Sequence, residues 1–127
     1  MTETLIIFTR YPEPGKTKTR MIPALGAEGA AKLQRKLTEH TLQQAKVLRS
    51  SRSVFLEVHY AGGNQQLMEQ WLGDNLTYYP QQQGDLGQRM CSAFTKAFAA
   101  GNERVVTIGI DCPDLNELLL NRAFELL

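Results

Sequence analysis

Charge of one sign, long apolar runs and cysteine are all scarce in this sequence, and each scarcity excludes a class of protein. The 127 residues carry 14 Lys and Arg against 13 Asp and Glu, a formal net charge of +1, so the chain lacks the positive excess of a general nucleic-acid binder. No apolar run approaches the ~20 residues that a helix needs to cross a bilayer. The start MTETLIIFTR is acidic where a secretory signal is basic. We therefore expect a cytoplasmic protein with no nucleic-acid or membrane partner.

Cysteine and histidine are too few for the sites that they commonly build. Cys91 and Cys112 are the two cysteines, too few for a disulfide framework and without the paired spacing of a zinc site, so we expect reduced thiols. Cys112 has no base near it in the sequence and is predicted to be a small buried thiol. His40 and His59 lack ligand spacing, and structural or surface roles are expected for both.

The sequence does contain a regular alternation of short apolar runs and amphipathic segments. The pattern predicts strands at 5–8, 54–60, 76–79 and 104–109, and helices at 27–48, 65–72, 86 to near 101, and from about 116 onward. The stripe of the first helix runs from Ala30 to Leu48 and places Gln34 on another face. Strands that alternate with helices imply right-handed crossovers, a mainly parallel sheet and a three-layer α-β-α fold.

The ending of the chain bears on its domain organisation. The last helical pattern runs to Leu126 and Leu127 without a capping glycine or a polar tail. We interpret residues 1–127 as a single α/β domain that lacks its C-terminal part. A terminal helix docked on the sheet is the alternative, because such helices are common.

The first candidate site is the loop that follows the first strand. Ligands of open parallel sheets bind beyond the carboxyl ends of the strands, so this loop is well placed. It gathers four cationic side chains and three hydroxyls around a glycine, which suits a phosphate-rich ligand. The candidate binding residues are Arg10, Gly15, Lys16, Thr17 and Arg20. The alternative is a solvated basic loop.

A P-loop is not the explanation of the GKT sequence in this segment. A Walker A motif needs a glycine where this chain has Arg10. Pro12 and Pro14 also remove backbone amide donors that a phosphate cradle would use.

The second candidate site is the turn that follows the fourth strand. Asp111 and Asp114 place two carboxylates three residues apart directly beyond a buried strand. Mg²⁺ is commonly bound by one or two carboxylates together with substrate phosphates, so a basic loop and this turn at one sheet edge predict a diphosphate bound to Mg²⁺ or Mn²⁺. The alternatives are that Asp114 or Asn116 caps the last helix and that Asp111 bonds turn amides.

The third candidate is a glycine-flanked acid at the start of a helix. Gly84 permits close approach of a ligand to the backbone, and Gln83 and Asp85 could bind the edge of a nucleobase. The same residues also read as a helix start, with Asp85 and Gln88 as a capping box. Both roles can hold together.

These segments resemble a known family. The stretches LIIFTRYPEPGKTKTRMIPALGAEGAAKL, QQQGDLGQRM and VVTIGIDCPDL are similar to those of bacterial nucleotide-diphospho-sugar transferases, some of which are linked to arsenosugar biosynthesis. The resemblance extends more distantly to nucleotidyltransferases that make molybdopterin dinucleotide and phospholactate guanylate derivatives. It implies a GT-A-like fold, with Lys16 and Arg20 at the nucleotide phosphates, residues 83–87 beside the nucleotide and Asp111 at the metal. Family members continue into a glycine-rich segment that this chain lacks.

The resulting functional hypothesis is a metal-dependent glycosyltransferase. Mg²⁺ or Mn²⁺ on Asp111 and Asp114 would offset charge on a diphosphate leaving group, with a nucleotide-sugar as donor and an unknown small molecule as acceptor. No catalytic base is identified. The alternatives are nucleotidyl transfer with release of pyrophosphate, and a catalytically incomplete nucleotide-binding or assembly module. The apolar residues Leu126 and Leu127 would favour the last and make a homo-oligomer possible.

Overall fold

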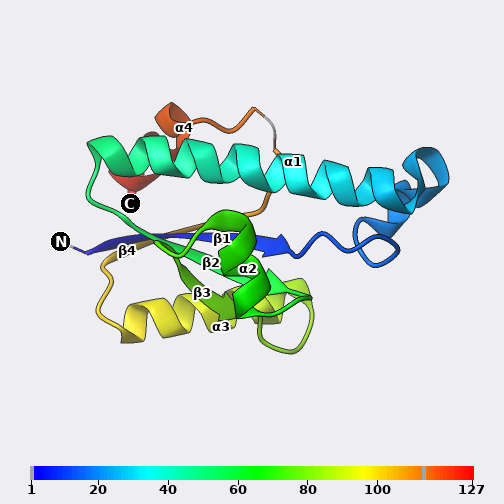
Figure 1. The fold of residues 1–127 in the computed structure, drawn as a ribbon. Helices are drawn as coiled ribbons and strands as arrows, with labels where there is room; N and C mark the ends of the chain where they lie inside the picture. The colour runs from blue at the N-terminus through cyan, green and yellow to red at the C-terminus, as the bar shows by residue number, and fades with distance from the viewer. Residues whose placement is uncertain (1, 113) are drawn as a thin grey trace.

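The predicted parallel sheet is present. The computed structural model describes residues 2–112 and 114–127, and within them four strands form one parallel sheet in the order β3-β2-β1-β4 (Figure 1). The strands are β1 (Glu3–Arg10), β2 (Phe55–Ala61), β3 (Thr77–Pro80) and β4 (Arg104–Ile108). In the central register, Ile7 of β1 lies opposite Val58 of β2 on one side and Ile108 of β4 on the other. Each predicted strand is confirmed to within a few residues.

Helices cover both faces of the sheet, which confirms the three-layer α-β-α prediction. The helical segments are the 3₁₀ turn η1 (Thr19–Met21), α1 (Ile22–Ser51), α2 (Gln65–Leu72), α3 (Leu86–Ala99) and α4 (Glu117–Leu126). In Figure 1, α1 and α4 lie on one side of the sheet and α3 lies on the other. Buried Met68 and Leu72 place α2 in the same core cluster as α1 and α4.

The alternation of side chains along β1 builds the two cores. Leu5 and Ile7 pack with α1, α2 and α4, whereas Ile6 and Phe8 pack with α3. Successive side chains of a strand point to opposite faces of the sheet. The continuous apolar run that predicted a doubly covered strand is therefore explained by burial on both sides.

The first helix begins earlier than predicted. Residues 19–25, expected to be loop, form η1 and the first turn of α1. Pro23 stands at the start of α1, where its fixed φ suits a helix and its missing N–H costs nothing. Gly26, with φ 76° and ψ 166°, then interrupts the helix before its long straight part. The sequence pattern detected only the part after this glycine.

Helix α4 docks on the core through one face. Leu120 and Phe124 are buried in the cluster beneath α1, while Leu126 and Leu127 are 74% and 58% exposed. Asn116 caps this helix by accepting a hydrogen bond from the backbone N–H of Leu119 at 3.0 Å. Of the two predicted caps, the structure selects Asn116.

A cluster of charged side chains, Glu3, Arg52 and Arg104, lies at the amino end of the sheet. Arg52 donates to the Glu3 carboxylate from Nε and Nη2 at 2.7 and 2.8 Å, and Arg104 donates from Nη1 at 3.1 Å. Arg52 also donates to Asn121 of α4. The hydrogen bonds from Arg52, with help from Arg104, lower the pKa of Glu3 against the opposing effect of burial. The cluster ties β1, β4, α1 and α4 together.

Candidate functional site

The strand order creates a switch point between β1 and β4. The chain moves outward from β1 to β2 and β3, then returns across the other face through α3 to place β4 on the far side of β1. In sheets of this kind, the connections on the two sides of such a point leave a crevice beyond the carboxyl ends of the strands. The loops after β1 and β4, which the sequence analysis selected, both begin there.

A cleft of about 290 Å³ lies at this point. Its walls come from the ends of β1 and β2, the segment after β4, and the start of α3. Its polar lining residues are Thr9, Arg10, Gln34, Gln81, Arg89 and Asp111. We call this the strand-end cleft. It contains two of the predicted site residues, Arg10 and Asp111.

An ion pair joins the two predicted loops. Lys18 Nζ lies 2.5 Å from Asp111 Oδ1, although the two residues are 93 positions apart. The Lys18 side chain is only 15% exposed, and its backbone is left-handed at φ 47°. Non-glycine residues seldom adopt this left-handed conformation. It reverses the backbone at Lys18. The prediction that the basic loop and the carboxylate turn meet at one sheet edge is confirmed.

The other residues of the basic loop have different surroundings. Arg10 is exposed at the end of β1, and Arg20 is exposed in η1. Lys16 is 72% exposed and lies 3.7 Å from Glu13. Gly15 is exposed with φ 85° and has open space where a Cβ would stand. These cationic side chains are accessible to an anion.

Thr17 has a role within the loop that the sequence did not reveal. It is fully buried, and its hydroxyl accepts from the backbone N–H of Glu13 at 2.8 Å and donates to the carbonyl of Tyr11 at 3.1 Å. Its hydroxyl therefore stabilises the loop, and its predicted role in phosphate binding stays a prediction.

The glycine-flanked acid opens α3 as a capping box. Asp85 Oδ1 accepts from the Gln88 N–H at 2.8 Å, and Gln88 Oε1 accepts from the Asp85 N–H at 2.9 Å. Gly84 has φ 115°, and a Cβ there would lie 2.3 Å from Gln88 Oε1, so the turn requires glycine. Gln83 is exposed beside it. The structural role is confirmed, and the nucleotide-binding role of this segment stays a prediction.

A polar network beneath the cleft was missed from the sequence. Gln34, expected away from the buried apolar stripe of its helix, is 4% exposed and donates to Thr9 Oγ1 at 3.0 Å and to the Arg10 carbonyl at 3.1 Å. That expectation was wrong because α1 buries polar side chains where it crosses the end of β1. Gln81 donates to the carbonyls of Thr9 and His59, and its Oε1 accepts from Arg89 at 2.6 Å. Hydrogen bonds of Gln34 and Gln81 thus hold the Arg10 backbone and the Arg89 side chain in place.

The turn after β4 carries exposed side chains. Asp111 is 70% exposed, and Asp114 and Cys112 are also exposed; Pro113 lies outside the described residues. The prediction that Cys112 is buried was wrong because the turn projects from the sheet edge. His59, by contrast, is 5% exposed, stacks on Phe8 and bonds Glu57, which confirms a structural role.

The side chains near Asp111 determine whether a metal ion could bind here. Within residues 2–112 and 114–127, no three His, Cys, Asp or Glu side chains gather in a group that could hold a metal ion. Asp111 offers one accessible carboxylate, and its Oδ1 faces the Lys18 ammonium. Because Mg²⁺ typically combines one or two carboxylates with substrate phosphates, the residues fit a metal shared with a bound diphosphate, not one held by the protein alone.

Fold and cleft together place the chain among open α/β domains with a ligand crevice at a topological switch point. Residues 41–127 match the family described as "Uncharacterized protein conserved in bacteria" (DUF2064), and the chain belongs to this family. No helix in the described part of the chain has the length and apolar character to span a membrane.

One solved structure extends the comparison to nearly the whole chain. It is the crystal structure of a protein from Desulfovibrio desulfuricans G20 named "putative nucleotide-diphospho-sugar transferase", which is 35% identical to this chain with a TM-score of 0.87. The similarity covers 98% of this chain and 54% of that protein, so this chain spans about half of its relative's length. The resemblance drawn from the three motifs is confirmed. No curated protein matches the chain.

Proposed function

We propose that this chain binds a nucleotide-diphospho-sugar in the strand-end cleft and forms the donor-binding part of a glycosyltransferase. The observation that carries the proposal is the meeting of Lys18 and Asp111, which brings a basic loop and an accessible carboxylate to the switch point of a parallel sheet. The name and the 35% identity of the Desulfovibrio protein support the same donor class. The similarity covers only 54% of that protein. The complete transfer reaction, like donor binding, is therefore proposed for this chain.

The accessible cations would bind the diphosphate. Arg10 and Arg20 can each donate two parallel hydrogen bonds to phosphate oxygens, and Lys16 supplies a compact charge. Gln83, Gly84 and Asp85 at the start of α3 would lie beside the nucleoside, with the capping box keeping Asp85 in place. Binding of a dianion here would release Lys18 from Asp111, because the ammonium can pair with phosphate instead.

Asp111, with Asp114 from the same turn, would hold Mg²⁺ or Mn²⁺ together with the phosphates. A divalent ion there supplies charge that stabilises a departing diphosphate. The protein's own contribution to transfer is then to orient the donor and to neutralise the leaving group through Arg10, Lys16 and Arg20. In glycosyl transfer, the bond between the sugar and the diphosphate breaks, the acceptor oxygen bonds to the sugar and loses its proton to solvent, and a nucleoside diphosphate leaves.

The first experiment is thermal unfolding in the presence of UDP, GDP, ADP and CDP, each with and without Mn²⁺. A ligand that binds the folded state raises Tm, so we expect one nucleotide to stabilise the protein in a Mn²⁺-dependent way. Asp111→Asn should remove the Mn²⁺-dependent part. Glu103→Gln, which changes an exposed carboxylate just before β4, is the matched control and should behave like wild type. No shift with any of the four nucleotides would refute the proposal.

Product analysis distinguishes sugar transfer from nucleotidyl transfer. Sugar transfer or donor hydrolysis yields a nucleoside diphosphate, whereas nucleotidyl transfer from a triphosphate yields pyrophosphate. Binding of a nucleotide without either product would support the third alternative, a nucleotide-binding or assembly module. Light scattering over a range of protein concentrations then tests self-association, for which the exposed Leu126 and Leu127 are the candidate contacts.

A further inference from the structure

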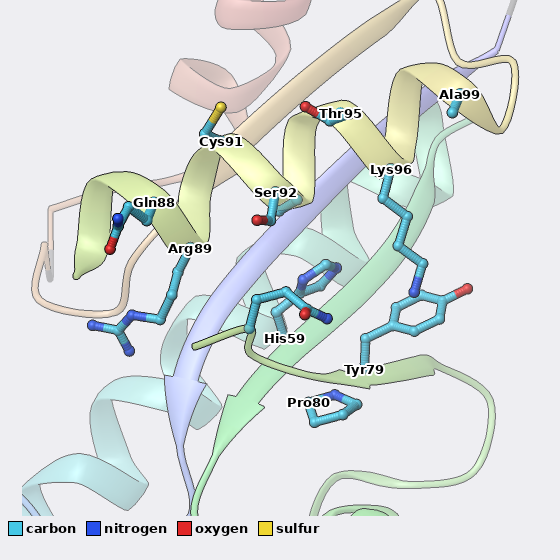
Figure 2. Close-up of a pocket in the computed structure, with 12 residues that line it drawn as sticks. His59, Tyr79, Pro80, Gln88, Arg89, Cys91, Ser92, Thr95, Lys96 and Ala99 are labelled. Atoms are coloured by element: carbon cyan, nitrogen blue, oxygen red, sulfur yellow. The ribbon is translucent and has the colours of Figure 1, made fainter. Parts of the chain in front are cut away.

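A second and larger pocket lies between α3 and the sheet. It has a volume of about 570 Å³ and is enclosed by β2, β3 and the side of α3 (Figure 2). We call it the α3 pocket. It lies against β3, at the sheet edge remote from β4. Its size is within the range of sites that hold small molecules.

Aromatic rings form the floor of the α3 pocket. The imidazole of His59 stacks on Phe8, with ring centroids 5.6 Å apart, and lies 5.4 Å from the ring of Tyr79. His59 is 5% exposed, and Glu57 fixes its ring through a hydrogen bond of 3.0 Å at Nε2. A floor of fixed rings favours a flat group packed against it.

Cationic and hydroxyl groups form the wall opposite this floor. Arg89, Ser92 and Lys96 follow one another at intervals of three and four along α3, so they share one side of the helix. In Figure 2, Lys96 extends from α3 to the ring of Tyr79. Its Nζ lies 3.3 Å from the ring centroid.

The charge of this wall has no carboxylate partner in the described part of the chain. Lys96 contacts the Tyr79 ring, and Arg89 donates to Gln81 Oε1 and the carbonyl of Asp85, both neutral acceptors. The residues that line the pocket include no Asp or Glu, and the Glu57 carboxylate is bonded to His59. Two positive charges about two helical turns apart, ~10 Å by helix geometry, therefore face an aromatic floor.

We propose that the α3 pocket binds a small anion that carries a flat ring. The Lys96 ammonium, which covers the Tyr79 ring at 3.3 Å from its centroid, would swing away to pair with the anionic group, and the flat ring would take its place against Tyr79 and His59. This site is separate from the strand-end cleft and does not depend on the proposed nucleotide. Arg89 lines both pockets, so a ligand in one lies next to a ligand in the other. A second substrate or a regulatory ligand of this chemistry would therefore be held beside the donor.

The probe is phenyl phosphate, and its binding to the whole chain is monitored by ¹H–¹⁵N NMR. We expect chemical-shift changes at Ser92, Thr95 and Lys96, and weaker binding of inorganic phosphate, which lacks the ring, and of benzyl alcohol, which lacks the charge. Lys96→Met keeps an apolar stem and should weaken phenyl phosphate at least tenfold. Lys36→Met on α1, across the sheet, is the matched control and should leave the affinity unchanged. Arg89 is left intact because it lines both pockets.

Three results would overturn the proposal. Shift changes confined to Arg10 and Asp111 would assign the anion to the strand-end cleft. Equal affinity in Lys96→Met and wild type would show that the wall charge is not used. If inorganic phosphate bound as tightly as phenyl phosphate, the aromatic floor would not contribute to binding. Tyr79→Leu tests the contribution of the floor independently, provided that its spectrum remains that of a folded protein. These outcomes do not depend on whether UDP or another nucleotide binds, so this proposal and the proposed function can fail separately.

Discussion

The two ends of the sheet use charge in opposite ways. At the amino end, Glu3 is buried between Arg52 and Arg104, and every strong donor of the cluster faces a carboxylate or amide oxygen. At the carboxyl end, Arg10 is exposed, and Asp111 is 70% exposed even though it pairs with Lys18. The first arrangement holds strands and helices together. The second leaves charge accessible to a ligand, which is the distinction that the following predictions test.

The largest expected effect is on stability, at the amino end. Glu3→Gln removes the anion shared by Arg52 and Arg104, and breaking a buried pair costs 3–5 kcal/mol in general. Because the two arginines are 20% and 29% exposed, we expect a loss of about 2–3 kcal/mol, measured by urea denaturation. Glu103→Gln is the control and should change the free energy of unfolding by no more than about 0.5 kcal/mol. Similar values for the two variants would remove the contrast between the ends.

At the carboxyl end, a charge change should alter binding and leave stability intact. Arg10→Gln removes an accessible guanidinium at the strand-end cleft, and charged hydrogen bonds to a ligand contribute about 1.5–3 kcal/mol. We expect roughly ten- to hundredfold weaker binding of the nucleoside diphosphate identified by thermal shift. Isothermal titration calorimetry gives the affinity, and urea denaturation should give an unchanged midpoint. A destabilised Arg10→Gln protein with normal affinity would contradict the assignment.

The pH dependence of stability should distinguish the same two ends. Because Arg52 and Arg104 lower the pKa of folded Glu3 below its ordinary value of 4.5, its carboxylate stabilises the fold above that pH. This contribution is lost as the pH falls through the lower folded value. Wild type should therefore lose more stability than Glu3→Gln when the pH is lowered below 4.5, as measured by urea midpoints. Parallel curves for the two proteins would show that Glu3 is not the group responsible.

Only a small stability effect is expected at Lys18. Its partner Asp111 is largely exposed, and ion pairs of this kind contribute about 0–1 kcal/mol. Lys18→Met should therefore leave the urea midpoint nearly unchanged while it frees the Asp111 carboxylate. We expect tighter Mn²⁺ binding in the presence of nucleotide, measured by calorimetry. Lys16→Met, which leaves the Lys18–Asp111 pair in place, is the control. Unchanged Mn²⁺ affinity in Lys18→Met would show that Lys18 does not compete for Asp111.

The fold was largely predictable because periodicity and capping are local signals. The apolar run at β1, the helical stripes and the Asp85–Gln88 capping box each depend on residues close in sequence. The position of the two loops at one sheet edge also followed, because parallel strands end at the same edge. The left-handed turn at Lys18 was not predictable, because its conformation and its distant partner Asp111 carry no local signature.

The polar base of the cleft was missed for a related reason. Gln34 looks like a surface residue beside charged neighbours on its helix, yet α1 turns it toward the backbone of Thr9 and Arg10. A search for apolar stripes cannot detect a buried amide whose partners belong to another element. The same limit applies to Arg89, which lines the cleft together with residues of β1, of β2 and of the segments after β3 and β4.

The strand order also determines when the sheet can be completed during synthesis. Of these four strands β1 is made first, and it can pair with β2 once residues 55–61 exist. The other edge of β1 stays unpaired until residues 104–108 are made, since Glu3 pairs with Arg104. Contacts so distant in sequence slow folding, because a long loop must close before they form. Until β4 is made, β1, which is buried along most of its length, therefore has an open edge, and the nascent chain is vulnerable to wrong strand pairing during that interval.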